Sequence, residues 1–288
     1  MATSITTSAM IVLKGEKPPS SPLEVINFIA LLGKDALELS KLLRSCQDPG
    51  SFYLDLSGKT KYFDGNSYLN SLRALYRQYK TDRSETSDPR GRSHCTAASF
   101  IESSSGSFTS SQSSYYASGS SFQEEDLVST LDDETKHLVK EYTHAVAHRL
   151  IRTLSPFIGS EQVRKYIASM HGDSDPSYSE MRVDEFLCLP EEDHDESPVG
   201  GFVDGSSFTL RYCEEDLLEY WDSESDGWAG IEPRDNCLIV NVGDALRTAS
   251  KNQFQSPLYR VRQSEGGHIR GSSPSRRVCV THHLWPMD

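Results

Sequence analysis

The sequence lacks closely spaced cysteines and long apolar runs. Its six cysteines are widely scattered with no CxxC spacing, which favours reduced thiols. No apolar stretch approaches the roughly 18 to 20 residues that a membrane-spanning helix needs. The first residues also lack the long hydrophobic segment of a signal peptide. We therefore predict a cytoplasmic protein that does not associate with membranes.

Basic residues are also in short supply. Lys and Arg number 29 against 42 Asp and Glu, which gives a formal net charge of -13. The acidic residues are spread along the chain, and such a surface repels phosphate backbones and anionic lipid headgroups. We predict that neither nucleic acid nor a membrane is a partner. A chain of 288 residues with ordinary apolar content can bury a substantial core, and we expect one compact domain.

The hydrophobic pattern changes along the chain from a helical period to a period of two. Apolar side chains at helical spacing predict helices over residues 23–46, 68–79 and 127–154, with a short strand at 51–58. Alternating patterns then predict strands at 181–189, 200–212, 236–246, 256–263 and 276–285. Helices followed by many short strands indicate the α+β class, a sandwich or barrel of strands with helices packed beside it.

A serine-rich segment at residues 81–122 interrupts this pattern. It contains almost no aliphatic side chains that could offset the entropy of ordering it. We predict a flexible surface insertion between residues 1–80 and 123–288. A substrate lid, a phosphorylated switch or a docking element for a protein partner are the alternatives.

Two sequence blocks carry a resemblance to a known enzyme family. Gly50–Gly58 (GSFYLDLSG) keeps the frame of GFFYLxNHG, and Val240–Asp244 with Phe254–Val261 follows the pattern NxGD and then FxSxxHRV. These blocks resemble the non-haem iron and 2-oxoglutarate dioxygenases of the isopenicillin N synthase type. The resemblance implies a jelly-roll, or double-stranded β-helix, with helices packed on one side.

The resemblance also implies where iron ligands would lie. The family holds Fe(II) with the two imidazoles and one carboxylate of HxD and a later HRV. These positions fall on Phe202, Asp204 and Tyr259, so only the carboxylate is kept. Phenylalanine has no lone pair, and a tyrosine with an ordinary pKa near 10 must lose its proton to bind metal strongly. We therefore predict no metal site, and expect neither of the family cofactors, Fe(II) and 2-oxoglutarate.

The family contacts to 2-oxoglutarate are altered as well. The NxY motif falls on residues 184–186 (DEF), where the tyrosine hydroxyl is missing. The RxS motif falls on Arg277 and Cys279, which open the last apolar run, so its serine is lost. A literal match at Arg270 lies in a Gly/Ser turn and remains the alternative.

Strand alternation indicates which side chains share the inner face of the barrel. If Asp204 points inward, Phe202 does too, and every second residue of the preceding strand accompanies them. The predicted substrate-binding residues are Arg277, Arg182, Phe202, Asp184 and Phe186. Arg182 can also pair with Asp184 or Asp204, which would lower the pKa of that carboxylate and make a structural ion pair instead of a catalytic base.

Three further histidine patterns can suggest a metal site. Residues 171–173 spell HxD but precede the barrel strands, and His144 and His148 are one helical turn apart without a carboxylate or cysteine nearby. Of His282 and His283 on the last strand, alternation sends only one inward, where it can meet Asp204. We expect solvated or capping roles for His144 and His148 and a helix-end turn at 171–173. A relocated metal site with Asp204 is the alternative for the histidine of the last strand.

Three functions remain open for a barrel without iron. The family is common in natural-product pathways, which implies a small organic metabolite as the partner. Asp204 and Tyr259 are the predicted catalytic residues, a general base and a general acid of a non-oxidative isomerase, dehydratase or cyclase. The first alternative is an inactive binding module, with a partner docked at the serine-rich segment. The second is an oxidoreductase with atypical iron ligands.

Overall fold

The computed structural model describes residues 23–82, 133–159, 161, 165, 179–188, 201–262 and 275–286. The serine-rich segment and the histidine pattern at 171–173 lie outside them. The helices are α1 (Phe28–Leu32), α2 (Ala36–Gln47), α3 (Gly65–Asp82), α4 (Asp133–Leu154), a 3-10 turn (Ser155–Phe157) and α6 (Asp244–Ala249). The strands are β1 (Val25–Asn27), β2 (Ser51–Asp55), β3 (Ser179–Cys188), β4 (Phe208–Tyr212), β5 (Leu218–Asp222), β6 (Gly227–Ile231), β7 (Cys237–Val242), β8 (Tyr259–Val261) and β9 (Ser275–Leu284).

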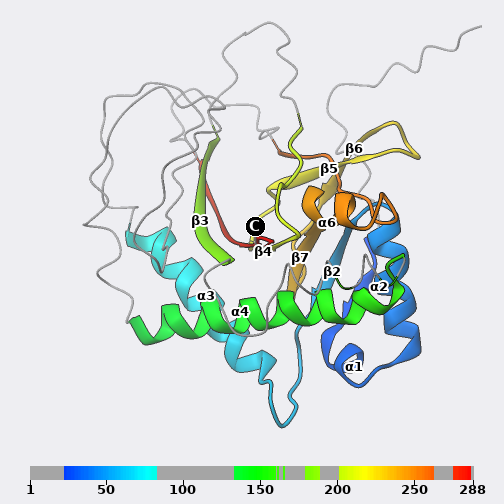
Figure 1. Ribbon diagram of the computed structural model, residues 1–288. Helices are drawn as coiled ribbons and strands as arrows, with labels where there is room; N and C mark the ends of the chain where they lie inside the picture. Colours follow the sequence, from blue (N-terminus) through cyan, green and yellow to red (C-terminus); the bar gives the residue numbers. More distant parts are fainter. Residues whose placement is uncertain are drawn as a thin grey trace, which may run out of the picture.

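The strands form two sheets. The larger has the order β1-β2-β7-β4-β9-β3, and the smaller has the order β6-β5-β8. Only the β1–β2 pair of the larger sheet is parallel. Helix α4 runs across one side of the larger sheet, and the β5–β6 hairpin lies on its other side (Figure 1). No helix in the described ranges combines the length and apolar character needed to cross a membrane.

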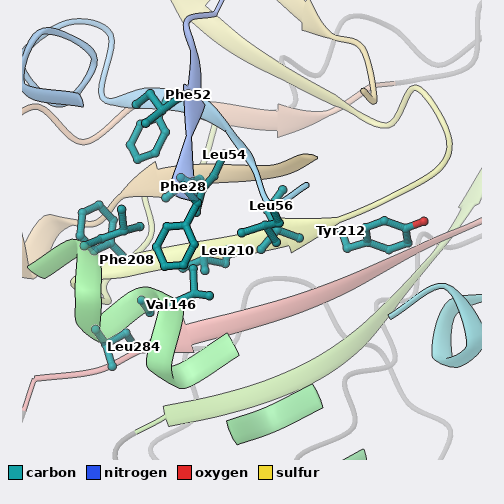
Figure 2. Packing of buried hydrophobic residues seen from close by; sticks show 14 of the residues in the cluster. Phe28, Phe52, Leu54, Leu56, Val146, Phe208, Leu210, Tyr212 and Leu284 are labelled. Atoms are coloured by element: carbon teal, nitrogen blue, oxygen red, sulfur yellow. The ribbon is translucent and has the colours of Figure 1, made fainter. Parts of the chain in front are cut away.

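Alternation along β4 divides the core into two parts. Phe208, Leu210 and Tyr212 face the helices, where Val146 of α4 joins the same buried cluster (Figure 2). Cys213 belongs to the second cluster, which fills the space between the two sheets. Because neighbouring residues of a strand point to opposite faces, Thr209 and Arg211 also lie between the sheets. The interior of the sandwich is therefore partly polar.

The predicted helix at 23–46 is divided into a strand and two helices. Asn27 ends β1 and caps α1 by accepting a hydrogen bond from the amide of Ala30, at 2.8 Å. Lys34 then takes a positive φ of 62°, and the Asp35 side chain caps α2. The prediction of one continuous helix was wrong because these caps stop and restart the helix, while β1 pairs with β2.

The predicted strand at 200–212 is shorter than expected. Regular pairing begins at Phe208, and Phe202 makes only an isolated bridge with Tyr259. The loop between Phe202 and Phe208 contacts the start of α6, where the amide of Asp244 donates a hydrogen bond to the carbonyl oxygen of Asp204 at 2.7 Å. The predicted strand at 236–246 correspondingly ends at Val242 and continues into α6.

Gly50 offers a test of the connection between α2 and β2. Its φ is +86°, and a Cβ at this position would lie 2.2 Å from the carbonyl oxygen of Gln255. We expect Gly50→Ala to lower the free energy of unfolding by at least about 1–2 kcal/mol, because an L side chain disfavours this conformation. The measurement is urea denaturation. Gly227→Ala is the control, since a Cβ at this position would lie 3.8 Å from its nearest neighbouring atom. Equal losses of stability in the two variants would show that the backbone at Gly50 does not specifically require glycine.

Candidate functional site

Three polar side chains meet between the sheets: Asp204, Arg211 and Tyr259, hereafter the Asp204 cluster. Nη2 of Arg211 donates to both carboxylate oxygens of Asp204, at 2.9 and 3.0 Å, and to the phenol oxygen of Tyr259, at 2.8 Å. The Tyr259 hydroxyl in turn donates to Oδ1 of Asp204, at 2.7 Å. The side chains of Asp204 and Arg211 are each only 5% exposed. The cluster is thus a buried ion pair with a phenol bonded to both members.

The local backbone brings these residues together. Phe202 and Tyr259 face each other across the isolated bridge, with N–O distances of 2.6 and 2.9 Å. Asp204 follows Phe202 by two residues, so the bridge brings its carboxylate to Tyr259. Arg211 comes from β4, whose apolar residues face the helices and so direct Arg211 into the interior.

Burial and charge act against each other in the cluster. Burial alone would raise the pKa of the Asp204 carboxyl, but the Arg211 guanidinium and its hydrogen bonds hold that pKa below the ordinary value. Burial raises the pKa of Tyr259 well above its ordinary value, with Arg211 opposing and Asp204 reinforcing the effect. At neutral pH the carboxylate is therefore ionised and the phenol keeps its proton.

His283 lies at the edge of the cluster. Its Nδ1 is 3.1 Å from the hydroxyl of Thr209, which contacts the hydroxyl of Ser206 at 3.0 Å. The positive form of His283 helps to lower the pKa of Asp204. Alternation on β9 thus turns His283 toward the interior, whereas His282 lies on the helix side.

The other predicted residues surround the cluster unevenly. Phe202 is 44% exposed, and its ring centroid is 6.1 Å from that of Tyr259. Asp184 accepts a hydrogen bond from the hydroxyl of Thr281, at 2.7 Å, and its charge helps to raise the pKa of Tyr259. Arg277 donates to the carbonyl oxygen of Asp216, at 2.7 Å. Phe202 and Asp184 therefore lie next to the cluster, whereas the Arg277 side chain is hydrogen-bonded to a backbone carbonyl group.

Two predicted residues can be placed only along β3. Arg182 is opposite Thr281 in the register with β9, and Phe186 is opposite Arg277. Their side chains lie outside the described part of the structure. Proposals for their contacts therefore stay predictions.

Arg211 is the residue of the cluster that the sequence analysis missed. Arg211 forms a buried ion pair with Asp204, while the alternative pairing of Arg182 with Asp184 or Asp204 stays a prediction. A usable signal was present, because Arg211 is a charged residue within the apolar run FTLRY and shares a face with Thr209. A strand with a buried charge calls for a buried partner of opposite charge.

Known proteins resemble this chain over most of its length. Residues 179–279 match the model of the 2OG-Fe(II) oxygenase superfamily. The chain is 26% identical over 255 residues to "2-oxoglutarate-dependent dioxygenase frbH" of Dothideomycetidae sp. (strain 11243), covering 83% of this chain and 75% of that protein. It is also 26% identical over 276 residues to "2-oxoglutarate-dependent dioxygenase gloE" of Glarea lozoyensis, and the match covers 93% of this chain and 81% of that protein.

The chain is thus similar to the 2OG-Fe(II) oxygenase superfamily, over residues 179–279 for the family model and over most of its length for these relatives. Among solved structures, full-length Neurospora crassa T7H in complex with alpha-KG and 5-formyluracil superposes with a TM-score of 0.63 at 15% identity, covering 94% of this chain and 88% of that one. The shared fold confirms the predicted α+β class with a jelly-roll core.

The described side chains do not suit the iron of this superfamily. Arg211 places a positive nitrogen within hydrogen-bond distance of both Asp204 oxygens and of Tyr259, where a cation would need to bind. A guanidinium repels Fe(II) and occupies the lone pairs that the metal requires. Phe202 supplies no donor. In the described ranges, no three or more His, Cys, Asp or Glu side chains are arranged to hold a metal.

Proposed function

We propose that this protein takes up a small organic metabolite in its jelly-roll and acts on it without iron-dependent oxidation. The observation that supports this most directly is the position of Arg211, whose Nη2 bonds to both Asp204 and Tyr259. We infer the ligand class from the similarity to frbH and gloE, which are both named 2-oxoglutarate-dependent dioxygenases. Isomerisation, dehydration and cyclisation are examples of reactions that need no external oxidant.

The cluster suggests a division of roles between its members. Asp204 is ionised but strongly paired, so its proposed role is to orient Arg211, and its lowered pKa makes it a weak base. Tyr259 keeps its proton and is the proposed proton donor. Arg211 is the group that can stabilise negative charge on a bound molecule.

An anaerobic titration with Fe(II) and 2-oxoglutarate tests the proposal. We expect no stoichiometric iron binding and no charge-transfer absorption, because one paired carboxylate cannot replace a triad of ligands. The matched gain-of-function variant is Phe202→His/Arg211→Leu/Tyr259→His, which supplies two imidazoles and removes the competing cation. This variant should bind iron more tightly than the natural protein. A charge-transfer band in the natural protein would return it to the oxidative class.

An inactive binding protein is the second candidate. It is favoured by the same contacts, since Asp204 and Tyr259 already satisfy each other's hydrogen bonds. Asp204→Asn and Tyr259→Phe distinguish the two candidates. The assay uses a metabolite that the natural protein converts. If the two residues are catalytic, both variants should still bind this metabolite but convert it at least about 100-fold more slowly, the usual contribution of a general acid or base.

A further inference from the structure

Arg211 uses only one of its two terminal nitrogens. Nη2 makes all three contacts with Asp204 and Tyr259. Nη1 is also buried, yet it has no hydrogen-bond partner among the residues that the structure describes. A buried N–H group without an acceptor carries the full cost of its lost hydration, and more so on a charged group. This arrangement is explained if a bound molecule supplies the acceptor.

The guanidinium is held rigidly enough to act as a binding group. Its Cζ lies 4.4 Å from the centroid of the Tyr259 ring, which covers one face. On β4, Arg211 is in register with Ile239 of β7 and Thr281 of β9, so it projects from a paired central strand. Asp204 fixes the direction of Nη2. Together these contacts fix the direction of Nη1, and because this nitrogen is buried, a ligand reaches it only after neighbouring side chains move aside.

Local charge decides what kind of acceptor fits. Asp204 already neutralises Arg211, and the carboxylate of Asp184 also acts on Tyr259, whose pKa it helps to raise. A second anion would therefore add negative charge to a buried region that is already balanced. A neutral oxygen with lone pairs satisfies Nη1 without this cost.

We propose that Nη1 of Arg211 binds the oxygen of a neutral carbonyl compound, such as a ketone, inside the jelly-roll. This inference rests on the proposed function and names the class of its ligand. The half-exposed ring of Phe202, which adjoins Tyr259, provides an apolar edge for the carbon skeleton. A fixed guanidinium N–H polarises the carbonyl group and stabilises negative charge that develops on its oxygen. This is the property that an isomerase or dehydratase acting next to a carbonyl group requires.

The test uses cyclohexanone labelled with ¹³C at its carbonyl carbon, titrated into the metal-free protein. We expect a downfield shift of the bound carbonyl signal and saturable binding. Arg211→Lys keeps a positive charge for Asp204 but removes the second nitrogen. It should bind the probe about 10- to 100-fold more weakly, as expected for loss of a charged hydrogen bond, and abolish the shift. Arg44→Lys, which alters an exposed ion pair on α2, is the control and should bind the probe normally.

Two further arms complete the experiment. Cyclohexanecarboxylate tests the anionic alternative, and methylcyclohexane tests binding by the apolar edge alone. If Arg211→Lys does not fold, judged by circular dichroism, the ¹⁵N-edited signals of Arg211 in the natural protein report the contact directly and should shift with cyclohexanone.

The inference is overturned if cyclohexanone leaves these signals unchanged, if Arg211→Lys binds it equally well, or if the carboxylate binds more tightly than the ketone. These results are separable from failure of the proposed function. A natural protein that loads Fe(II) overturns the proposed function, whereas a metal-free protein whose Nη1 does not respond to the ketone overturns this inference alone.

Discussion

Replacing Arg211 with leucine is expected to lower the free energy of unfolding by about 3–5 kcal/mol. Leucine removes the guanidinium but leaves Asp204 buried, with its carboxylate bonded only to Tyr259 among the members of the cluster. A buried charge without its partner must either stay uncompensated or take up a proton. The pKa of Asp204, now below its ordinary value, should therefore rise in this variant. Urea denaturation at pH 7 measures the loss of stability.

A double variant separates the loss of the charge pair from the loss of packing. Asp204→Asn/Arg211→Leu removes both charges and keeps an oxygen for the Tyr259 hydroxyl. It should recover much of the lost stability, because removing a whole buried pair costs far less than removing one member. Arg44→Leu is the surface control, and should cost less than about 1 kcal/mol, since the pair between Arg44 and Glu24 is exposed. If Arg211→Leu proved as stable as this control, Arg211 would not be compensating the buried charge of Asp204.

An internal ion pair and a bound metal solve the same problem in different ways. A carboxylate at the centre of a jelly-roll needs a cation, which the family supplies from solution. Here Arg211 supplies it from β4, and the positive charge becomes part of the fold. The burial that would raise the pKa of Asp204 is overcome by Arg211 in the same way that a metal would overcome it. Stability of the barrel is therefore expected to be independent of iron.

The sequence carried enough information to find two members of this cluster. The spacing of Asp204 and Tyr259 in the family blocks predicted that they meet, and the structure places the phenol oxygen 2.7 Å from the carboxylate. Arg211 was missed because its contact depends on the closure of the loop between Phe202 and β4. Periodicity shows which face a residue occupies, but not which loop covers that face.

The division of the predicted first helix shows a similar limit. Apolar spacing over residues 23–46 predicts one helix, although Asn27 and Asp35 within it are both common N-cap residues. Pairing of β1 with β2 brings together residues 28 positions apart, such as Val25 and Tyr53. A local hydrophobic pattern contains no information about such a distant pairing. Residues 25–27 therefore form a strand because of tertiary contacts that the pattern does not show.

His282 is expected to make the protein lose stability in mild acid. Its ring is fully buried, and neither ring nitrogen has a hydrogen-bond partner within the described part of the chain. Burial lowers its pKa well below 6.5, and the charges of His144, His283 and Lys140 act in the same direction. Its surroundings are otherwise largely apolar, with Leu72, Met181, Leu210 and Val280 among the residues lining a small cavity.

The sign of the effect follows from proton binding in the two states. Above pH 6.5 His282 is neutral in both the folded and the unfolded protein, so it has no effect on the pH dependence. Below pH 6.5 the unfolded chain binds a proton that the folded protein does not. The free energy of unfolding should therefore fall by up to about 1.4 kcal/mol per pH unit, until the pH reaches the lowered pKa of the folded state.

His282→Leu isolates this contribution from other groups that titrate in acid. Leucine has a similar volume and suits the apolar lining, so the variant should fold and should retain more stability than the natural protein at pH 5. Urea denaturation at pH 8, 6.5, 5.5 and 4.5 gives the difference between the two proteins at each pH. That difference should grow only below pH 6.5, by up to about 1.4 kcal/mol per pH unit. A difference that stays constant across the series would show that a proton reaches His282 in the folded protein, and that the space between α4 and the large sheet admits water.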